Sequence, residues 1–160
     1  MSAPLVPAAR PLIGEEEIAA VAAVMRSGMI AQGPEVAAFE EEFARAMAPG
    51  ARAVAVNSGT SALHLGLLAA GIGPGDAVVV PSFTFAATGN SVAISGAVPV
   101  FADIDPVTFT LDPASVEASI TERTVAIEVV HLYGLPANMP EILAIAERHG
   151  MAVFEDCATA

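Results

Sequence analysis

Short apolar segments alternate with amphipathic segments along this chain. The apolar segments predict strands at residues 53–56, 77–80, 98–102, 125–130 and 151–154. Between them, apolar residues recur at helical spacing, which predicts helices over residues 15–26, 34–47, 60–70, 86–94, 112–120 and 139–149. Almost wholly apolar strands are typical of a parallel sheet that is buried on both faces. The alternation therefore predicts a doubly wound α/β fold, a mainly parallel sheet with helices on both faces.

The domain organisation follows from the same pattern. At 160 residues the chain is long enough to bury a sizeable core, and it shows no linker, low-complexity segment, repeat or second domain. It ends shortly after the last predicted strand, where an α/β domain ordinarily continues with a crossover helix. We therefore expect residues 1–160 to be a fragment of a larger domain.

The composition bears on the cellular location of the protein. Hydrophobic residues make up 54% of the chain, yet no apolar run reaches the roughly 18–20 residues of a membrane helix. Residues 1–11 contain one arginine and no central apolar stretch, so they do not predict a signal peptide. The single cysteine, Cys157, excludes an intrachain disulfide and fits a reducing compartment. We expect a cytoplasmic protein with no membrane partner.

The charged residues exclude two further classes. The net charge is −12, and all six basic residues are arginines scattered along the chain, so no basic surface for a nucleic acid is predicted. Glu15–Glu17 and Glu40–Glu42 lie on predicted helices and are interpreted as solvated faces. His64, His131 and His149 are widely dispersed, so no metal site is predicted.

A small-residue turn marks a candidate anion site. The segment Asn57–Leu65 follows a predicted strand and opens a predicted helix. The N–H groups of a helix N-terminus lack intrahelical partners and carry the positive end of the helix dipole. Ser58, Thr60 and Ser61 add hydroxyl donors, and Gly59 lets the backbone approach a phosphate closely. Taken alone, the same residues also fit an ordinary N-cap serine followed by a turn.

Two other segments lie where a ligand is expected. Open α/β sheets bind ligands at the carboxyl ends of their strands, and the loop at residues 81–85 and the Glu155–Asp156 pair follow predicted strands. With the turn at residues 58–61 they supply a phosphate cradle, an aromatic ring and a carboxylate. Asp156 alone fits a helix cap equally well, and Phe85 alone fits the core. The glycine patterns of dinucleotide-binding folds, P-loops and α/β-hydrolases are absent.

The ordered set of motifs is similar to a known family. Its members share segments that match Gly28–Val36, Asn57–Leu65, Pro81–Phe85, Val130–Gly134 and Glu155–Ala158. The chain resembles the DegT/DnrJ/EryC1/StrS family, sugar aminotransferases that use pyridoxal 5′-phosphate (PLP). The resemblance implies the N-terminal part of the large domain of a fold type I (aspartate-aminotransferase-like) PLP enzyme. Residues 1–160 would be a partial PLP-binding large domain, truncated before the region of the Schiff-base lysine.

The resemblance also implies roles for particular residues. Gly59 and Thr60 match positions that hold the PLP phosphate, and Phe85 matches the aromatic residue that stacks on the pyridine ring. Asp156 matches the carboxylate that pairs with the pyridine nitrogen and keeps it protonated, which makes the ring an electron sink.

Other family positions carry weaker implications. Ser61 and Thr159 are additional cofactor-binding candidates, although Thr159 stands where the family usually has the longer Gln or His. His131 also matches a family position, but packing or hydrogen bonding explains it as well, so we leave it out of the site. The family's lysine is expected beyond Ala160, and residues 1–160 contain no lysine, so they carry no catalytic residue and should be inactive alone.

The implied activity is the transfer of an amino group from an amino acid, glutamate by expectation, to a nucleotide-linked keto sugar. Such reactions serve the biosynthesis of polysaccharide or antibiotic sugars, and fold type I sites imply a homodimer. Two alternatives stay open, a PLP-dependent sugar dehydratase with histidine in place of the lysine and a non-catalytic regulatory homologue. A nicotinamide-binding domain ranks last, because its glycine fingerprint is absent.

Overall fold

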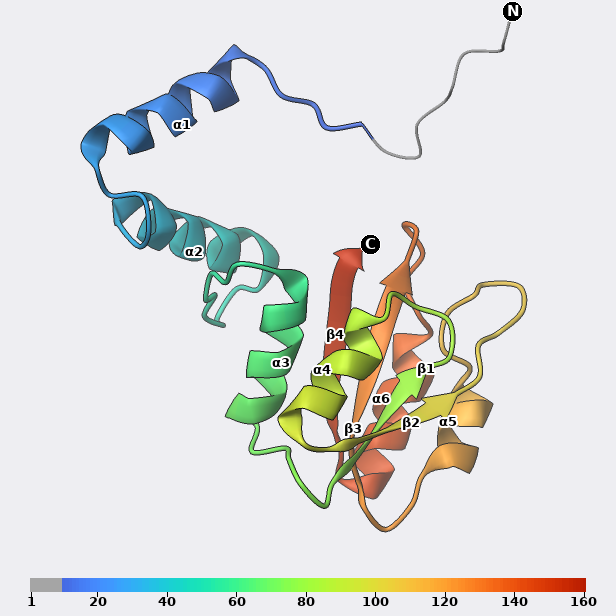
Figure 1. The fold of residues 1–160 in the computed structure, drawn as a ribbon. Coiled ribbons are helices and arrows are strands. Elements are labelled where there is room, and N and C mark those ends of the chain that lie inside the picture. The colour runs from blue at the N-terminus through green and yellow to red at the C-terminus, as the bar shows by residue number, and fades with distance from the viewer. Residues whose placement is uncertain (1–9) are drawn as a thin grey trace, which may run out of the picture. The chain divides into compact units, whose positions relative to one another are not determined.

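The computed structural model describes residues 10–160, so the interpretation of residues 1–11 lies almost wholly outside it. The chain forms two compact units, Met1–Ala55 and Val56–Ala160. In the first unit, α1 (Glu15–Ser27) and α2 (Pro34–Met47) confirm the two helices predicted there (Figure 1). Across the described part of the chain, no helix is both long and apolar enough to cross a membrane.

The strand predicted at residues 53–56 is wrong. This segment pairs with no other strand among the described residues. The N–H of Ala55 instead donates to the side chain of Glu40, with an N···Oε1 distance of 2.8 Å. An apolar pattern favours a strand only when a neighbouring strand completes the ladder, and here a carboxylate satisfies the backbone donor.

The second unit contains a four-stranded parallel sheet in the order β2-β1-β3-β4. Its strands are β1 (Ala77–Pro81), β2 (Val98–Ala102), β3 (Thr124–Leu132) and β4 (Ala152–Thr159). The two central strands, β1 and β3, are buried along almost their whole length, which confirms the parallel α/β prediction. The predicted end of the last strand at residue 154 is wrong, because β4 continues beside β3 to Thr159. Asp156 therefore lies within a strand and not in a loop after it.

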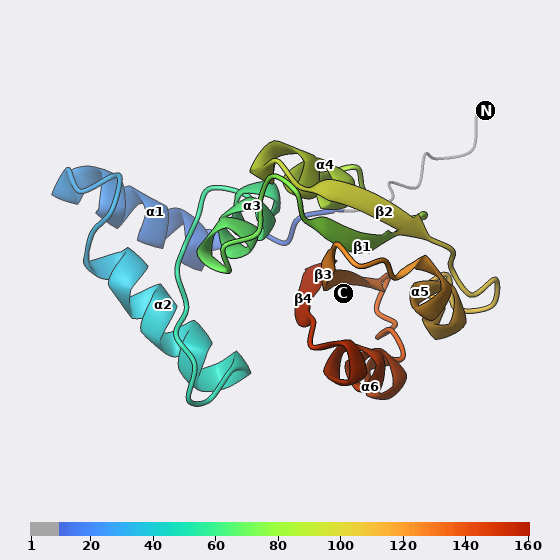
Figure 2. The same cartoon turned by 90° about the horizontal axis from the view of Figure 1, so that it is seen from below.

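Helices cover both faces of the sheet (Figure 2). Leu67 of α3 (Gly59–Ala69) and Val92 of α4 (Ala87–Ser95) pack with Val78 and Val80 on one face. The opposite face packs against α5 (Pro113–Ser119) and α6 (Met139–His149) through Val116, Ile142 and Ile145. Each fully buried side chain of this size stabilises the fold by about 1.5–3 kcal/mol. All four helices were predicted from the sequence to within a few residues.

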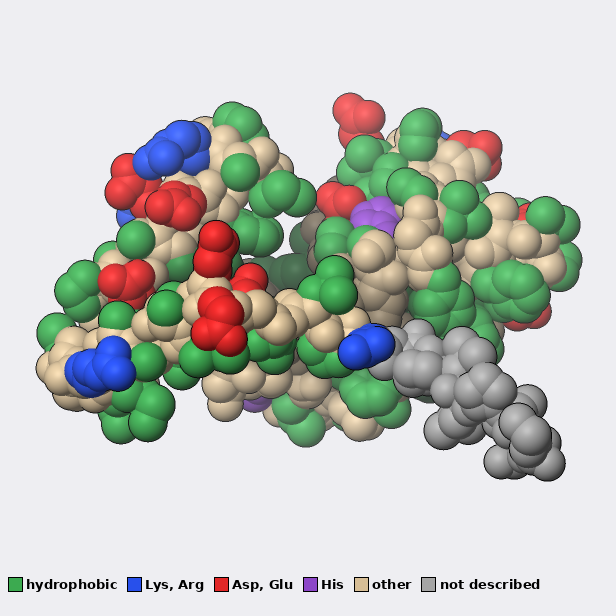
Figure 3. Space-filling model, turned by 90° about the horizontal axis from the view of Figure 1, so that it is seen from above, with side chains coloured by type: hydrophobic (Ala, Val, Ile, Leu, Met, Phe, Trp, Pro, Cys, Tyr) green, Lys and Arg blue, Asp and Glu red, His purple; other side chains and the backbone are tan. Residues whose placement is uncertain are grey.

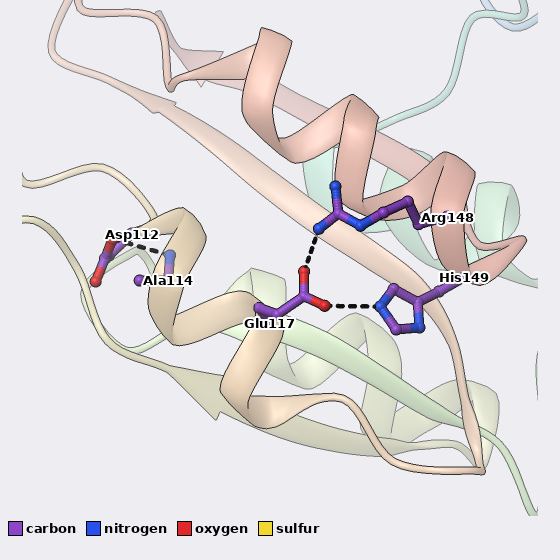
Figure 4. Close-up of polar contacts among 5 residues, drawn as sticks. All are labelled: Asp112, Ala114, Glu117, Arg148 and His149. Carbon is purple, nitrogen blue, oxygen red and sulfur yellow. Dashed lines mark hydrogen bonds and ion pairs between the residues drawn. The ribbon is translucent and has the colours of Figure 1, made fainter.

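A polar contact joins α5 to α6 on the surface (Figure 4). Asp112 caps α5 by accepting a hydrogen bond from the N–H of Ala114 at 3.1 Å. One turn later, Glu117 accepts from Arg148 and contacts His149 Nε2 at 2.9 Å. The hydrogen bond from His149 is the main cause that lowers the pKa of Glu117 below its usual value. The groups are exposed, so the contact orients the helices more than it stabilises them.

Gly96 provides a test of the packing that holds α4 in place. It ends α4 at φ 91°, and a Cβ at this position would lie 2.9 Å from Pro74 Cγ. Gly150 ends α6 at φ 66° but has open space around it. We expect Gly96→Ala to lower the free energy of unfolding by at least about 2 kcal/mol, because strain and overlap add. Gly150→Ala adds strain alone, about 1 kcal/mol. Urea denaturation measures both, and equal losses would contradict the packing at Gly96.

Candidate functional site

The turn at the start of α3 is held by its own side chains. Ser58 is the N-cap, and its Oγ accepts from the N–H of Ser61 at 3.1 Å. The Ser61 hydroxyl donates to Asn57 Oδ1 at 2.7 Å. The interpretation as a helix cap is therefore confirmed. The N–H groups of Gly59 and Thr60 have no partner within the helix, so the turn still offers two donors at the positive end of the dipole.

A pocket of about 170 Å³ opens between this turn, the loop before α4 and the end of β4. It brings together five of the six candidate residues, Gly59, Thr60, Phe85, Asp156 and Thr159. Its remaining lining residues are Leu63, Thr84, Ala87, Val130 and Ala158. The sequence therefore identified residues that the fold places around one hollow, although they are far apart in the chain.

Asp156 supplies a fixed negative charge at the base of this pocket. Only 8% of the residue is exposed, and its Oδ1 accepts from the N–H of Ala158 at 3.0 Å. Its Oδ2 accepts from the Thr88 hydroxyl of α4 at 3.4 Å. Val130 pairs with Asp156 and Leu132 with Thr159, so β4 carries one extra residue between these pairs, a β-bulge. The hydrogen bond from the Ala158 N–H lies within this bulge and helps to orient the carboxylate.

Phe85 lies at the mouth of the pocket. It is 74% exposed, so the ring is free to contact a flat ligand and is not a core residue. Beside it, the hydroxyls of Thr84 and Thr88 lie 3.0 Å apart. Because Thr88 also bonds to Asp156, this pair links the loop that carries Phe85 to the carboxylate.

The weaker candidates differ in where they lie. Ser61 does not line the pocket, because its hydroxyl bonds to Asn57 and Ser58. Thr159 does line it, but its hydroxyl donates to the His131 carbonyl at 3.1 Å. The His131 ring accepts at Nδ1 from the N–H of Ala137 and lies 2.9 Å from Glu155 at Nε2. This ring therefore connects β3 to β4 by hydrogen bonds and does not line the pocket.

Glu128 is a residue of this region that the sequence analysis missed. It lies in the middle of β3, fully buried, where the apolar pattern hides a single acidic residue. Its Oε2 accepts from the Ser91 hydroxyl at 3.5 Å, and its Oε1 has no hydrogen-bond partner among the described residues. Burial, and then the negative charge of Asp156, raises the pKa of Glu128 to about 8. A charged residue inside a central strand was the signal that could have found it.

Other chemistries find no support among residues 10–160. No group of three or more His, Cys, Asp or Glu residues there is arranged to hold a metal ion. Desolvation and the charges of Glu155 and Asp156 raise the pKa of Cys157, which disfavours the reactive thiolate. A larger hollow of about 700 Å³ between α1 and α2 is lined mainly by apolar and small side chains, with Glu35 as its titratable residue. We therefore take the pocket at Asp156 as the candidate site.

Comparisons with known proteins identify the family of this chain. Residues 11–160 match the model of the DegT/DnrJ/EryC1/StrS aminotransferase family. The chain belongs to this family. Members of the family use PLP, so the cofactor expected from the sequence is confirmed at the level of the family.

Relatives and solved structures of the family show the same fold. The chain is 49% identical over 154 residues to the spore coat polysaccharide biosynthesis protein SpsC of Bacillus subtilis, covering 96% of this chain and 39% of SpsC. It superposes on S. venezuelae DesV with a TM-score of 0.86 at 48% identity, covering 91% of this chain and 39% of DesV. It also superposes on NtdA of Bacillus subtilis, solved with bound cofactor PMP, with a TM-score of 0.84 at 38% identity, covering 90% of this chain and 34% of NtdA. The chain therefore spans less than two fifths of each, and its fold type I architecture is confirmed.

The residues of the pocket fit the chemical groups of PLP. The free N–H groups of Gly59 and Thr60 suit a phosphate, and the exposed Phe85 ring suits the flat face of a pyridine. Asp156 is a buried carboxylate with no basic side chain paired to it among residues 10–160, so a protonated ring nitrogen would complete it. A Cβ at position 59 would lie 3.7 Å from the Ala158 Cβ, in van der Waals contact, so glycine leaves the space between the turn and β4 unfilled.

The buried Glu128 predicts an unusual dependence of stability on pH. Because its folded pKa is raised to about 8, the folded state holds a proton that the unfolded state has released, and stability falls as pH rises from about 4.5 to about 8. Glu128→Gln removes this titration, so the variant should be more stable than the wild type at pH 7 by about 1–3 kcal/mol. Thermal or urea denaturation at several pH values measures the difference, which should vanish below about pH 4.5.

Glu117→Gln is the matched control for this prediction. The pKa of Glu117 is lowered by its partners on α6, so its contribution is present at neutral pH and lost as the solution becomes acidic. The control should therefore be slightly less stable than the wild type at pH 7 and equal to it in acid. If Glu128→Gln followed the pH dependence of the control, Glu128 would not be a buried neutral acid.

Proposed function

We propose that an intact protein carrying this segment is a PLP-dependent aminotransferase. It transfers an amino group from an amino acid, glutamate by our proposal, to a nucleotide-linked keto sugar. The observation that carries the proposal is a buried carboxylate, Asp156, that shares one pocket with the open N-terminus of α3. A fixed charge that shares a pocket with an anion site suits a ligand with a cationic ring and a phosphate.

Each residue of the pocket has a distinct role in this proposal. Gly59 and Thr60 bind the phosphate through the N-terminus of α3, and Phe85 orients the ring by stacking. Asp156 holds a proton on the ring nitrogen, oriented by Ala158 and Thr88. When bound, PLP supplies an electron sink for the carbon that loses a proton.

The substrate and the missing amine are also proposals. SpsC is called a spore coat polysaccharide biosynthesis protein, which supports a sugar substrate. PLP chemistry requires an amine, and residues 1–160 contain no lysine, so we propose that it comes from outside this segment. Lysine at the matching position supports aminotransfer, histidine supports the alternative dehydratase, and neither residue supports a regulatory homologue.

Asp156 and Thr60 separate the roles of charge and phosphate binding. Asp156→Asn keeps the shape but removes the charge, so we expect turnover of the intact enzyme to fall at least about 10²-fold while bound PLP persists. Asp156→Glu should be less damaging, because the charge remains. Steady-state kinetics and the absorbance of retained cofactor measure the two effects.

Thr60→Ala serves as the reciprocal variant. It alters the phosphate end of the pocket, so PLP retention should weaken more than turnover measured at saturating cofactor. Near-normal turnover in Asp156→Asn would contradict the assignment of this residue to the ring nitrogen, and the proposed function with it.

We also propose that the intact protein is a homodimer. Neither α1 nor α2 buries a residue, and large apolar side chains on them are exposed, among them Ile18, Met25, Phe39 and Phe43. Figure 3 shows hydrophobic side chains spread among acidic ones over the surface that it presents. Ile18 and Met25 are seven residues apart on α1, and Phe39 and Phe43 are in contact on α2, so each pair lies on one helix face. Apolar helix faces exposed in this way mark interaction surfaces. Sedimentation velocity should show a dimer or a multiple of one, and a fully active monomer at working concentration would contradict this.

A further inference from the structure

Glu128 is a buried acid that neither the core nor the proposed reaction explains. It is fully buried on β3 among apolar residues, and one of its carboxyl oxygens has no hydrogen-bond partner in the described part of the chain. An unpaired carboxylate in such a place is strongly disfavoured relative to the neutral acid. A buried acid without a partner lowers the stability of the fold. Its presence is therefore better explained by a role in the neighbouring site than by packing.

The register of the sheet places Glu128 beside Asp156. Glu128 pairs with Phe154 and Val130 with Asp156 on the neighbouring strand. Paired residues and alternate residues of a strand share a face of the sheet. The side chains of Glu128 and Asp156 therefore lie on the same face, on neighbouring strands and two residues apart in register. Both lie beneath α4, where Ser91 donates to Glu128 and Thr88 donates to Asp156.

The surroundings of Glu128 offer no other charge to balance it. On this face β1 contributes Val78 and Val80, and α3 contributes Leu67, all apolar. The hydroxyls of Thr88 and Ser91 come from α4, and β4 contributes Asp156 as the titratable group whose charge acts on Glu128. Within residues 10–160, no arginine or histidine forms an ion pair with Glu128. Two carboxyl groups in one apolar layer favour a state in which one of them keeps its proton.

We propose that Glu128 is a positioning residue of the ring-nitrogen site, a neutral acid that leaves the single negative charge of the pair on Asp156 and releases its proton when a cationic ring binds there. This inference rests on the proposed function, which assigns Asp156 to the ring nitrogen. The ring's positive charge offsets the charge of Asp156, which is one of the two causes that keep Glu128 protonated at neutral pH. By linkage, ionised Glu128 then strengthens binding of the protonated ring by the same factor.

Proton release on binding of pyridoxamine 5′-phosphate to the intact apoprotein tests this inference. The probe has the ring and phosphate of the cofactor but no aldehyde, so it forms no bond to an amine. Calorimetric titration at about pH 7.5 in two buffers of different ionisation enthalpy gives the number of protons released. We expect the wild type to release a fraction of a proton more than Glu128→Gln, which has the same shape and does not titrate.

The affinities provide a second readout. Between about pH 6 and pH 9, the affinity of the wild type relative to Glu128→Gln should rise about tenfold for each unit by which the ring lowers the pKa of Glu128. In Asp156→Asn the charge is already removed, so the additional proton release should disappear. A purely structural role for Glu128 would change the level of binding but not its pH dependence.

Infrared spectroscopy tests the neutral acid without any cofactor. The difference between wild type and Glu128→Gln at about pH 7 should contain the C=O band of a protonated carboxylic acid. That band should titrate near pH 8 in the wild type and at a lower pH in Asp156→Asn.

The outcomes distinguish the two proposals. Equal proton release from wild type and Glu128→Gln, or a carboxylate at Glu128 at neutral pH, overturns the role of Glu128 and leaves the proposed function standing. Failure of the probe to bind either protein overturns the proposed function, and this inference with it. Should the Gln variant not fold, the infrared titration of wild type against Asp156→Asn decides the question alone.

Discussion

The parallel pairing of β3 with β4 is the constraint on which the site depends. It fixes Asp156 in a strand under α4, on the face that the start of α3 also approaches through Gly59. A carboxylate in a loop could turn toward water, whereas this one is held by the ladder and by two hydrogen bonds. The site is therefore preorganised by the fold, and little further ordering is required when a ligand binds.

The charges of the site form a simple arrangement. The positive end of α3, the buried carboxylate of Asp156 and the exposed Phe85 ring all line one pocket. Under the proposed function, a ligand with a phosphate and a protonated ring contacts both charges, and these two contacts set its orientation. Glu128, on the strand beside Asp156, is a second carboxyl group, and its raised pKa keeps it protonated and neutral at neutral pH. Under this inference, the electrostatic field in the pocket depends on a residue that does not line it.

Much of this fold and site could be predicted from the sequence, because both rest on local patterns. The helices begin or end at Gly, Pro and Asp residues that interrupt the apolar periodicity. The motif around Phe85 follows β1, Gly59 opens α3, and Asp156 lies near the end of β4. The errors have physical reasons. Residues 53–56 have an apolar pattern but no pairing strand among the described residues, and β4 continues through polar residues because β3 continues beside it. Glu128 was missed because an apolar run hides a single acid, and its neighbour Asp156 is distant in sequence.

The bulge in β4 has a consequence for the geometry of the chain that follows Asp156. Side chains alternate between the faces of a strand, so one extra residue exchanges the faces of all later positions. Without it, residue 158 would pair with Leu132, and Thr159 would point to the opposite face of the sheet. With it, Thr159 pairs with Leu132 and lines the same pocket as Asp156. A single inserted position, invisible in composition or hydropathy, therefore brings the Thr159 side chain to the pocket of the buried carboxylate, beside Ala158.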